Sequence, residues 1–243
     1  MRILDVLVAF LVPSVLTLLI ARDMWRSVQP MRLMVRGRYA EARSAAAVLA
    51  TSWMRWVSGV RTSAPYMIAL ANHLEGNLEE AGAELRRLAS GVYGPLDPNT
   101  TFAVQSLEVA NLVLQQTDPE RVLRLLSDTA KVRVLPRDEL MAAITLLALD
   151  RREEAETHFV AAGTELVLPE PKRGTVVLLW DKALEGATFF TLRGMYLRQI
   201  GRETEAVEAL LRASAPYDSD KTNVYVEGAR RLLADASLAA PEP

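Results

Sequence analysis

One short pattern recurs five times along this chain and constrains its fold more than any other feature. It is clearest at residues 194–213, GMYLRQIGRETEAVEALLRA, where one helical stretch ends at a glycine and an acidic residue opens the next. Related blocks begin at Gly37, Gly76, Thr117, Asp150 and Gly201. Glycine supplies the positive φ that ends a helix, and acidic residues favour the positive end of the following helix dipole. Each block therefore predicts a turn between two antiparallel helices.

Small residues occupy fixed places around these turns. The sixth place of the block holds Ala42, Ala81, Val122, Ala155 and Ala206. The place seven residues before each of the last four turns holds Ala69, Ala110, Ala143 and Gly194. In the third block, Asp118 and Pro119 predict an N-cap followed by a proline at the first helical position. The spacing predicts closely packed helix pairs, at loose intervals of 39, 41, 33 and 51 residues.

This combination of small residues, turn and acidic helix start resembles the tetratricopeptide repeat over roughly residues 30–215. The resemblance implies an all-α protein with a right-handed α-solenoid of about five helix hairpins, in which the first helix of each hairpin lines a concave groove for a peptide or partner helix. The early Trp, the closing Pro and the carboxylate clamp of that family are largely missing here, so chaperone C-terminal tails are not expected as ligands. Related helical-hairpin repeats stay open as an alternative.

Counting back from each turn gives the groove positions that the resemblance implies. They are Tyr66, Leu70, His73, Leu107, Asn111, Leu114, Leu140, Ile144, Leu147, Thr191, Met195 and Arg198. Most of these side chains are apolar, and two interpretations of them stand side by side. Either the face binds a protein partner, or a neighbouring helix of the same chain covers it.

The N-terminal segment of residues 3–20, ILDVLVAFLVPSVLTLLI, carries a single charge. As a helix it would span about 27 Å, close to the roughly 30 Å hydrocarbon core of a bilayer. Pro13 is tolerated inside membrane helices. We predict a single transmembrane helix here; a cleaved signal peptide and a buried soluble helix are the alternatives.

The charges next to this segment predict its orientation. Only Arg2 precedes it, whereas five arginines follow it between Arg22 and Arg38. Because positive flanks stay in the cytoplasm, the C-terminal helical domain is expected there. Arg22, Trp25 and Arg26 are predicted to anchor the chain at the membrane interface. Residues 1–62 hold a balance of +6 and the remainder −8; the acidic bulk argues against a nucleic-acid partner.

The chain divides into four predicted regions. Residues 1–25 form the anchor and its interfacial flank, and 26–62 a basic first helical unit. Residues 63–215 contain the repeats, with an insertion near 164–180, and 216–243 a capping helix and tail. Within the insertion, residues 166–168 and 175–180 could pair as a hairpin, or the second run could start a long helix that reaches Gln199.

No motif for catalysis is present. The chain has no Cys, and His73 and His158 belong to no spaced ligand set, so neither a metal nor a cofactor is expected. Acidic pairs at helix starts are explained by the helix dipole. We therefore expect a non-enzymatic protein whose partners are other proteins and, through residues 3–20, the lipid bilayer. It would act as a structural or accessory subunit of a membrane complex or, alternatively, as an adaptor that recruits a soluble protein or peptide through its groove.

Overall fold

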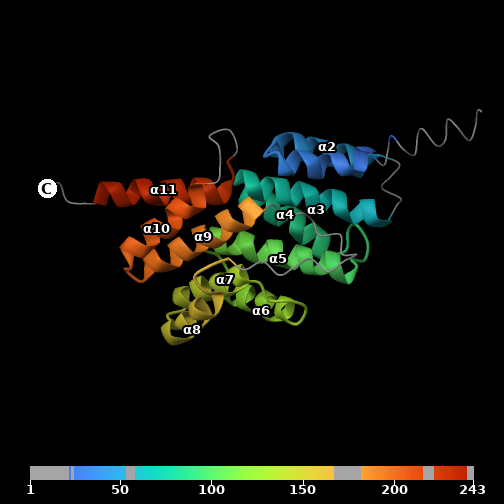
Figure 1. Ribbon diagram of the computed structural model, residues 1–243. Coiled ribbons are helices and arrows are strands. Elements are labelled where there is room, and N and C mark those ends of the chain that lie inside the picture. The colour runs from blue at the N-terminus through green and yellow to red at the C-terminus, as the bar shows by residue number, and fades with distance from the viewer. Residues whose placement is uncertain (1–21, 23–24, 53–57, 167–181, 216–221, 240–243) are drawn as a thin grey trace, which may run out of the picture.

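Helical hairpins joined in series make up the described part of the chain (Figure 1). The computed structural model describes residues 22, 25–52, 58–166, 182–215 and 222–239. After a helix at residues 25–35, the helices are α2 (Tyr39–Thr51), α3 (Ser58–Glu75), α4 (Leu78–Ala89), α5 (Pro98–Gln115), α6 (Pro119–Ala130), α7 (Pro136–Ala148), α8 (Arg152–Ala162), α9 (Lys182–Gln199), α10 (Glu203–Ser214) and α11 (Val224–Ala239). No strand occurs among these residues, which confirms the all-α prediction.

Each hairpin bends through the same backbone turn. One residue adopts a positive φ: 73° at Gly37, 85° at Gly76, 54° at Gln116, 56° at Asp150 and 80° at Gly201. The N–H of the following residue then donates to the carbonyl five positions earlier: Arg38 to Leu33, Asn77 to Asn72, Thr117 to Leu112, Arg151 to Leu146 and Arg202 to Leu197. This is the Schellman hydrogen bond, which satisfies a carbonyl at the helix end. The five predicted turns are all confirmed.

The third turn differs from its prediction by one residue. Gln116, and not the aligned Thr117, adopts the left-handed conformation, and Asp118 adopts it as well, with a φ of 48°. Pro119 disfavours the right-handed helical conformation for the residue before it, and Asp tolerates the left-handed region better than most residues. The Asp118 carboxylate accepts from the N–H of Arg121 at 3.2 Å, so its predicted role as N-cap is confirmed.

The small residues pack where the helices of a pair meet. Those predicted at the sixth place are buried: Ala42, Ala81, Val122, Ala155 and Ala206. So are those predicted on the preceding helices: Ala69, Ala110, Ala143 and Gly194. The closest approach is at Gly194 in α9, where an added Cβ would lie 2.6 Å from Cγ and Cδ2 of Leu210 in α10. Gly194 therefore allows these two helices to touch.

The helix pairs stack in chain order, and the last helix returns to the first pairs. Helix α5 contacts α3 and α7, and α9 contacts α7 and α11. The start of α11 meets the end of α3, far away in sequence (Figure 1). Tyr225 and Val226 of α11 share a core with Ala71 and Leu74 of α3 and Ala187 of α9. The predicted capping helix is thus present, and it connects both ends of the array.

Several predictions fall on residues outside the described part of the chain. These are the transmembrane helix at 3–20, the hairpin of residues 166–168 and 175–180, and the final residues of the tail. Helix α9 ends at Gln199, as predicted. None of the helices that the structure describes has the length and apolar character needed to cross a bilayer.

The contact at Gly194 can be tested against a second glycine of the same helix. Gly194→Ala should destabilise the protein by about 1–3 kcal/mol, because a methyl group is forced into a filled interface. A Cβ added to Gly186 would meet nothing within 4 Å. Gly186→Ala should therefore be neutral, or stabilising by up to about 1 kcal/mol through helix propensity. Chemical unfolding followed by circular dichroism measures both; equal effects would contradict the assignment of Gly194 to the interface.

Candidate functional site

The twelve predicted groove residues lie on the expected helices, but none of their side chains is exposed. Seven are buried: Tyr66, His73, Leu107, Asn111, Leu140, Ile144 and Thr191. The other five are partly buried: Leu70, Leu114, Leu147, Met195 and Arg198. Sequence periodicity thus located the inward face correctly. Helices of the same chain cover the buried part of this face.

Helix α11 covers this face through a polar network. His73 of α3 is hydrogen-bonded at Nδ1 to Oδ1 of Asn111 (3.1 Å) and at Nε2 to the hydroxyl of Tyr225 (2.9 Å). Asn111 of α5 donates in turn to the carbonyl of Leu78 at 2.8 Å. Thr191 of α9 donates to the carbonyl of Tyr225 at 3.1 Å. Two of these predicted groove residues, His73 and Thr191, therefore bind the last helix of their own chain, and Arg198 donates to its Leu232 carbonyl at 3.0 Å.

The interior around this network disfavours charge on His73. Burial lowers the pKa of His73 to about 4, with a smaller contribution in the same direction from the positive charge of Arg137. The hydrogen bond to Asn111 acts in the opposite sense. Burial also raises the pKa of the Tyr225 hydroxyl. His73 is therefore neutral at physiological pH, and its network is uncharged.

A buried ionic cluster adjoins the network. Arg137 at the start of α7 pairs with Glu185 at the start of α9, and its Nε lies 3.8 Å from the Asp138 carboxylate. Burial raises the pKa of Glu185 and of Asp138, and the charge of Arg137 opposes both shifts. A cavity of about 20 Å³ separates Arg137 from His73 and Tyr225, which is room for roughly one water molecule. No sequence pattern predicts this cluster, because Arg137 and Glu185 lie 48 residues apart and meet only after folding.

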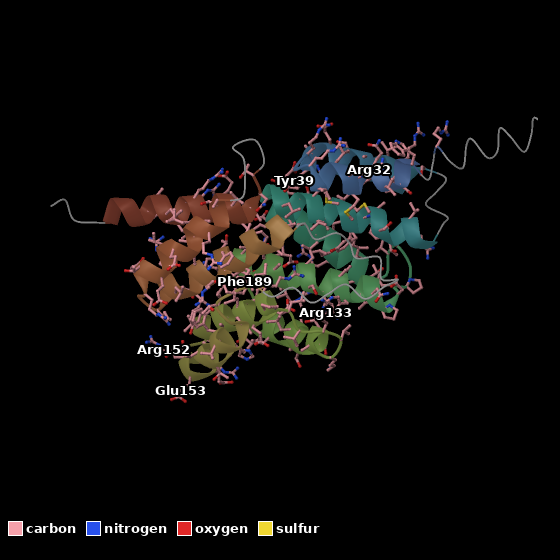
Figure 2. All side chains as sticks on the ribbon, in the orientation of Figure 1. Arg32, Tyr39, Arg133, Arg152, Glu153 and Phe189 are labelled. Carbon is pink, nitrogen blue, oxygen red and sulfur yellow. The ribbon has the colours of Figure 1, made fainter. Side chains whose placement is uncertain are left out.

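A larger cleft of about 790 Å³ opens where α5, α7 and α9 end, and we call it the α7 cleft. Its apolar lining includes Leu112, Ile144, Leu147 and Ile200, and its polar lining includes Gln116, Arg152, Glu153, Glu156, Tyr196 and Gln199. Arg152 and Glu153 project from the outer edge of the molecule (Figure 2). Ile144 and Leu147 belong to the predicted groove, so part of that prediction falls in an open site.

The wall of the α7 cleft is held rigidly. The Tyr196 hydroxyl donates to Glu156 of α8 at 2.8 Å, and burial together with this bond raises the Tyr196 pKa. The Tyr196 ring stacks on Phe159, with 4.4 Å between ring centroids. The guanidinium of Arg193 lies 4.5 Å from the centroid of Phe159. An apolar floor with a few fixed polar groups is suited to binding an apolar side chain or a short segment.

A second cleft of about 750 Å³, the α11 cleft, lies between the first turn, α3, α9 and α11. Leu114, Thr191 and Met195 of the predicted groove line it. Asn223 caps α11 by accepting from the N–H groups of Tyr225 (2.9 Å) and Val226 (3.2 Å). Its buried Nδ2 has no hydrogen-bond partner.

Metal binding requires several ligand side chains close together. Within the described ranges, no three His, Asp or Glu side chains come together closely enough to hold a metal ion. His158 is hydrogen-bonded to Glu139 at 2.6 Å, on another part of the surface.

The predicted interface residues lie apart from both clefts, before the first turn. Trp25 is exposed, and the guanidinium of Arg32 lies 3.9 Å from its ring centroid. Arg22 and Arg26 are exposed as well.

Comparisons of the chain with protein-family models, with curated proteins and with solved structures give no match. Fold and site together therefore define a class only, an all-α protein of helical hairpins with surface clefts.

The low pKa of His73 predicts a specific pH dependence of stability. The unfolded chain takes up a proton near pH 6.5, whereas folded His73 stays neutral to about pH 4. Stability should therefore be full above pH 6.5 and fall by about 1.4 kcal/mol per pH unit below it, until about pH 4.

The matched variant is His73→Gln, which has no proton to bind at this position. Glu185 and Asp138 contribute a slope of opposite sign, because their raised pKa values favour protonation in the folded state. This contribution is common to both proteins, so the difference between their urea-unfolding free energies isolates His73. Parallel curves from pH 7.5 to 5 would show that His73 is not buried as a neutral side chain.

Proposed function

We propose that this protein is a non-enzymatic, membrane-anchored helical-repeat protein that serves as a structural or accessory subunit of a membrane complex. The proposal includes a right-handed solenoid of tetratricopeptide type. It is supported by the five equivalent turns, by the small residues buried between paired helices, and by first helices that contact one another in chain order. Such an array presents extended surfaces to partner proteins.

The observation that carries the subunit proposal is the burial of His73 and Thr191 beneath α11, to which both are hydrogen-bonded. A repeat adaptor that captures peptides needs an open concave face. Here the part of that face formed by α3 and α9 is occupied by the C-terminal helix of the same chain. A preformed module whose interior is filled is better suited to a fixed place in an assembly, with the outer surfaces making the contacts.

The membrane location rests on the sequence. Residues 3–20 are long and apolar enough to span a bilayer, and the arginines that follow favour a cytoplasmic helical domain. The exposure of Trp25 supports its role at the interface, because amphipathic aromatic rings prefer the headgroup level.

An adaptor that recruits a soluble protein or peptide is the second candidate function. It is favoured by the α7 cleft, whose size and apolar floor suit a protruding apolar side chain. In this proposal residues 3–20 only raise the local concentration of the protein at the membrane.

Location is tested by protease protection in sealed inside-out vesicles. A cytoplasmic helical domain is on the outside of these vesicles and should be digested without detergent. Protection of the domain until detergent is added would place it on the opposite side of the membrane.

The two functions are separated by purification in mild detergent. The subunit proposal expects a stable complex that dissociates when residues 3–20 are replaced by an unrelated span, and that survives Leu147→Glu in the α7 cleft. The adaptor proposal expects a complex that survives replacement of residues 3–20 and dissociates with Leu147→Glu. Leu211→Glu is the matched control, because Leu211 is an exposed leucine that lines neither cleft. A complex that tolerates all three changes would contradict both proposals.

A further inference from the structure

Helix 25–35 exposes a face on which apolar and basic side chains alternate. The face consists of Trp25, Val28, Arg32, Val35 and Arg36, and we call it the basic face. Trp25, Val28 and Val35 are 55%, 43% and 45% exposed, which is high for side chains of this kind. Spacings of three, four and three residues between Trp25, Val28, Arg32 and Val35 bring these side chains to one side of the helix.

The other side of this helix fixes its orientation. Pro30 and Met34 are buried, and Met34 shares a core with Tyr39 and Ala42 of α2 and with Ala71 of α3. The helix therefore cannot rotate to hide Trp25 without giving up this packing. The first hairpin also lies at one edge of the molecule (Figure 1), so the basic face points outward.

The charge on this stretch is of one sign. Residues 25–40 contain four arginines and no acidic residue. The next acidic side chain after this stretch, Glu41, is paired with Arg38. Arg32 stacks over Trp25, with 3.9 Å between its guanidinium carbon and the ring centroid. Its guanidinium is thereby held next to an apolar ring, an arrangement suited to a boundary between water and hydrocarbon.

We propose that the basic face binds the anionic surface of a lipid bilayer. Arg32 and Arg36 contact lipid phosphates, and Trp25, Val28 and Val35 enter the headgroup region, as in helices that lie in the membrane interface. The proposal rests on the membrane location proposed above. Trp25 follows Ile20 by five residues, so it lies within about 17 Å of the end of the proposed span even if the chain is fully extended.

An acidic protein surface would also attract arginines, but two features favour lipid. The exposed apolar side chains alternate with the charges, whereas protein interfaces gather apolar residues in a central core with a polar rim. The proposed span also holds this helix at the bilayer in every state of the protein. An edge-on orientation of the domain follows. Arg152 and Glu153 lie at the edge opposite Arg32 (Figure 2), so the α7 cleft that they line faces away from the bilayer.

The absence of Cys from the chain permits a direct test with single-cysteine variants of the full-length protein. A nitroxide label is placed at Val28→Cys in the basic face or, as the matched control, at Val160→Cys in α8, where the valine is 68% exposed. The proteins are reconstituted into vesicles of phosphatidylcholine, with and without phosphatidylserine. Electron paramagnetic resonance measures accessibility to a water-soluble nickel complex, and resistance to alkaline extraction reports on the span independently.

In anionic vesicles, the label at position 28 is expected to be about fivefold less accessible to nickel than the label at position 160. A factor of about five corresponds to the binding free energy of one arginine at an anionic surface. Arg32→Glu together with Arg36→Glu should abolish this protection and leave extraction resistance and helix content unchanged. About 1 M salt should weaken it, because the Debye length shrinks to about 3 Å.

Two results would overturn the inference while leaving the span intact. One is equal accessibility at positions 28 and 160 in extraction-resistant protein. The other is protection at position 28 that persists in neutral vesicles, or after charge reversal, which would assign the face to another partner such as protein. Protein that is removed by alkaline extraction would instead contradict the proposed anchor, and protection at position 28 in anionic vesicles would then still support the basic face.

Discussion

The structure depends on one backbone turn. A residue in the left-handed conformation ends a helix, and the N–H of the next residue donates to the carbonyl five positions before it. It occurs at Gly37, Gly76, Gln116, Asp150 and Gly201 with the same geometry. Because it reverses the chain within a few residues, two helices must lie antiparallel and in contact. Small residues on both helices then become necessary, and Gly194 against Leu210 is the tightest example.

A repeated hairpin alone would leave an apolar face open, and α11 covers the part of that face formed by α3 and α9. Tyr225 brings a hydroxyl to His73, which in turn holds Asn111. Each of these polar groups would be costly to bury unpaired, since a lost partner costs about 1–3 kcal/mol. The network therefore selects one position of α11 among the many that apolar contact alone would allow. The packing of α11 both closes the array of hairpins and keeps His73 neutral.

Because part of the inward face is filled, the proposed binding is assigned to surfaces that stay open. The α7 cleft combines an apolar floor with the fixed pair of Tyr196 and Glu156. The basic face lies on the first hairpin, where none of the described helices covers the outer side of helix 25–35 (Figure 1). The two surfaces lie toward opposite edges of the molecule (Figure 2), an arrangement consistent with the proposed place between a membrane and partner proteins.

The sequence by itself determined the local structure. The turns, the N-cap at Asp118, the small residues between helices and the face to which each groove residue belongs all follow from interactions within a few residues or one helix pair. Tertiary structure alone decided whether the inward face is open, because His73 meets Tyr225 across 152 residues. It likewise decided that Arg137 pairs with Glu185, 48 residues away, in the interior. Helical periodicity reports which side chains share a face, but not which distant helix packs against that face.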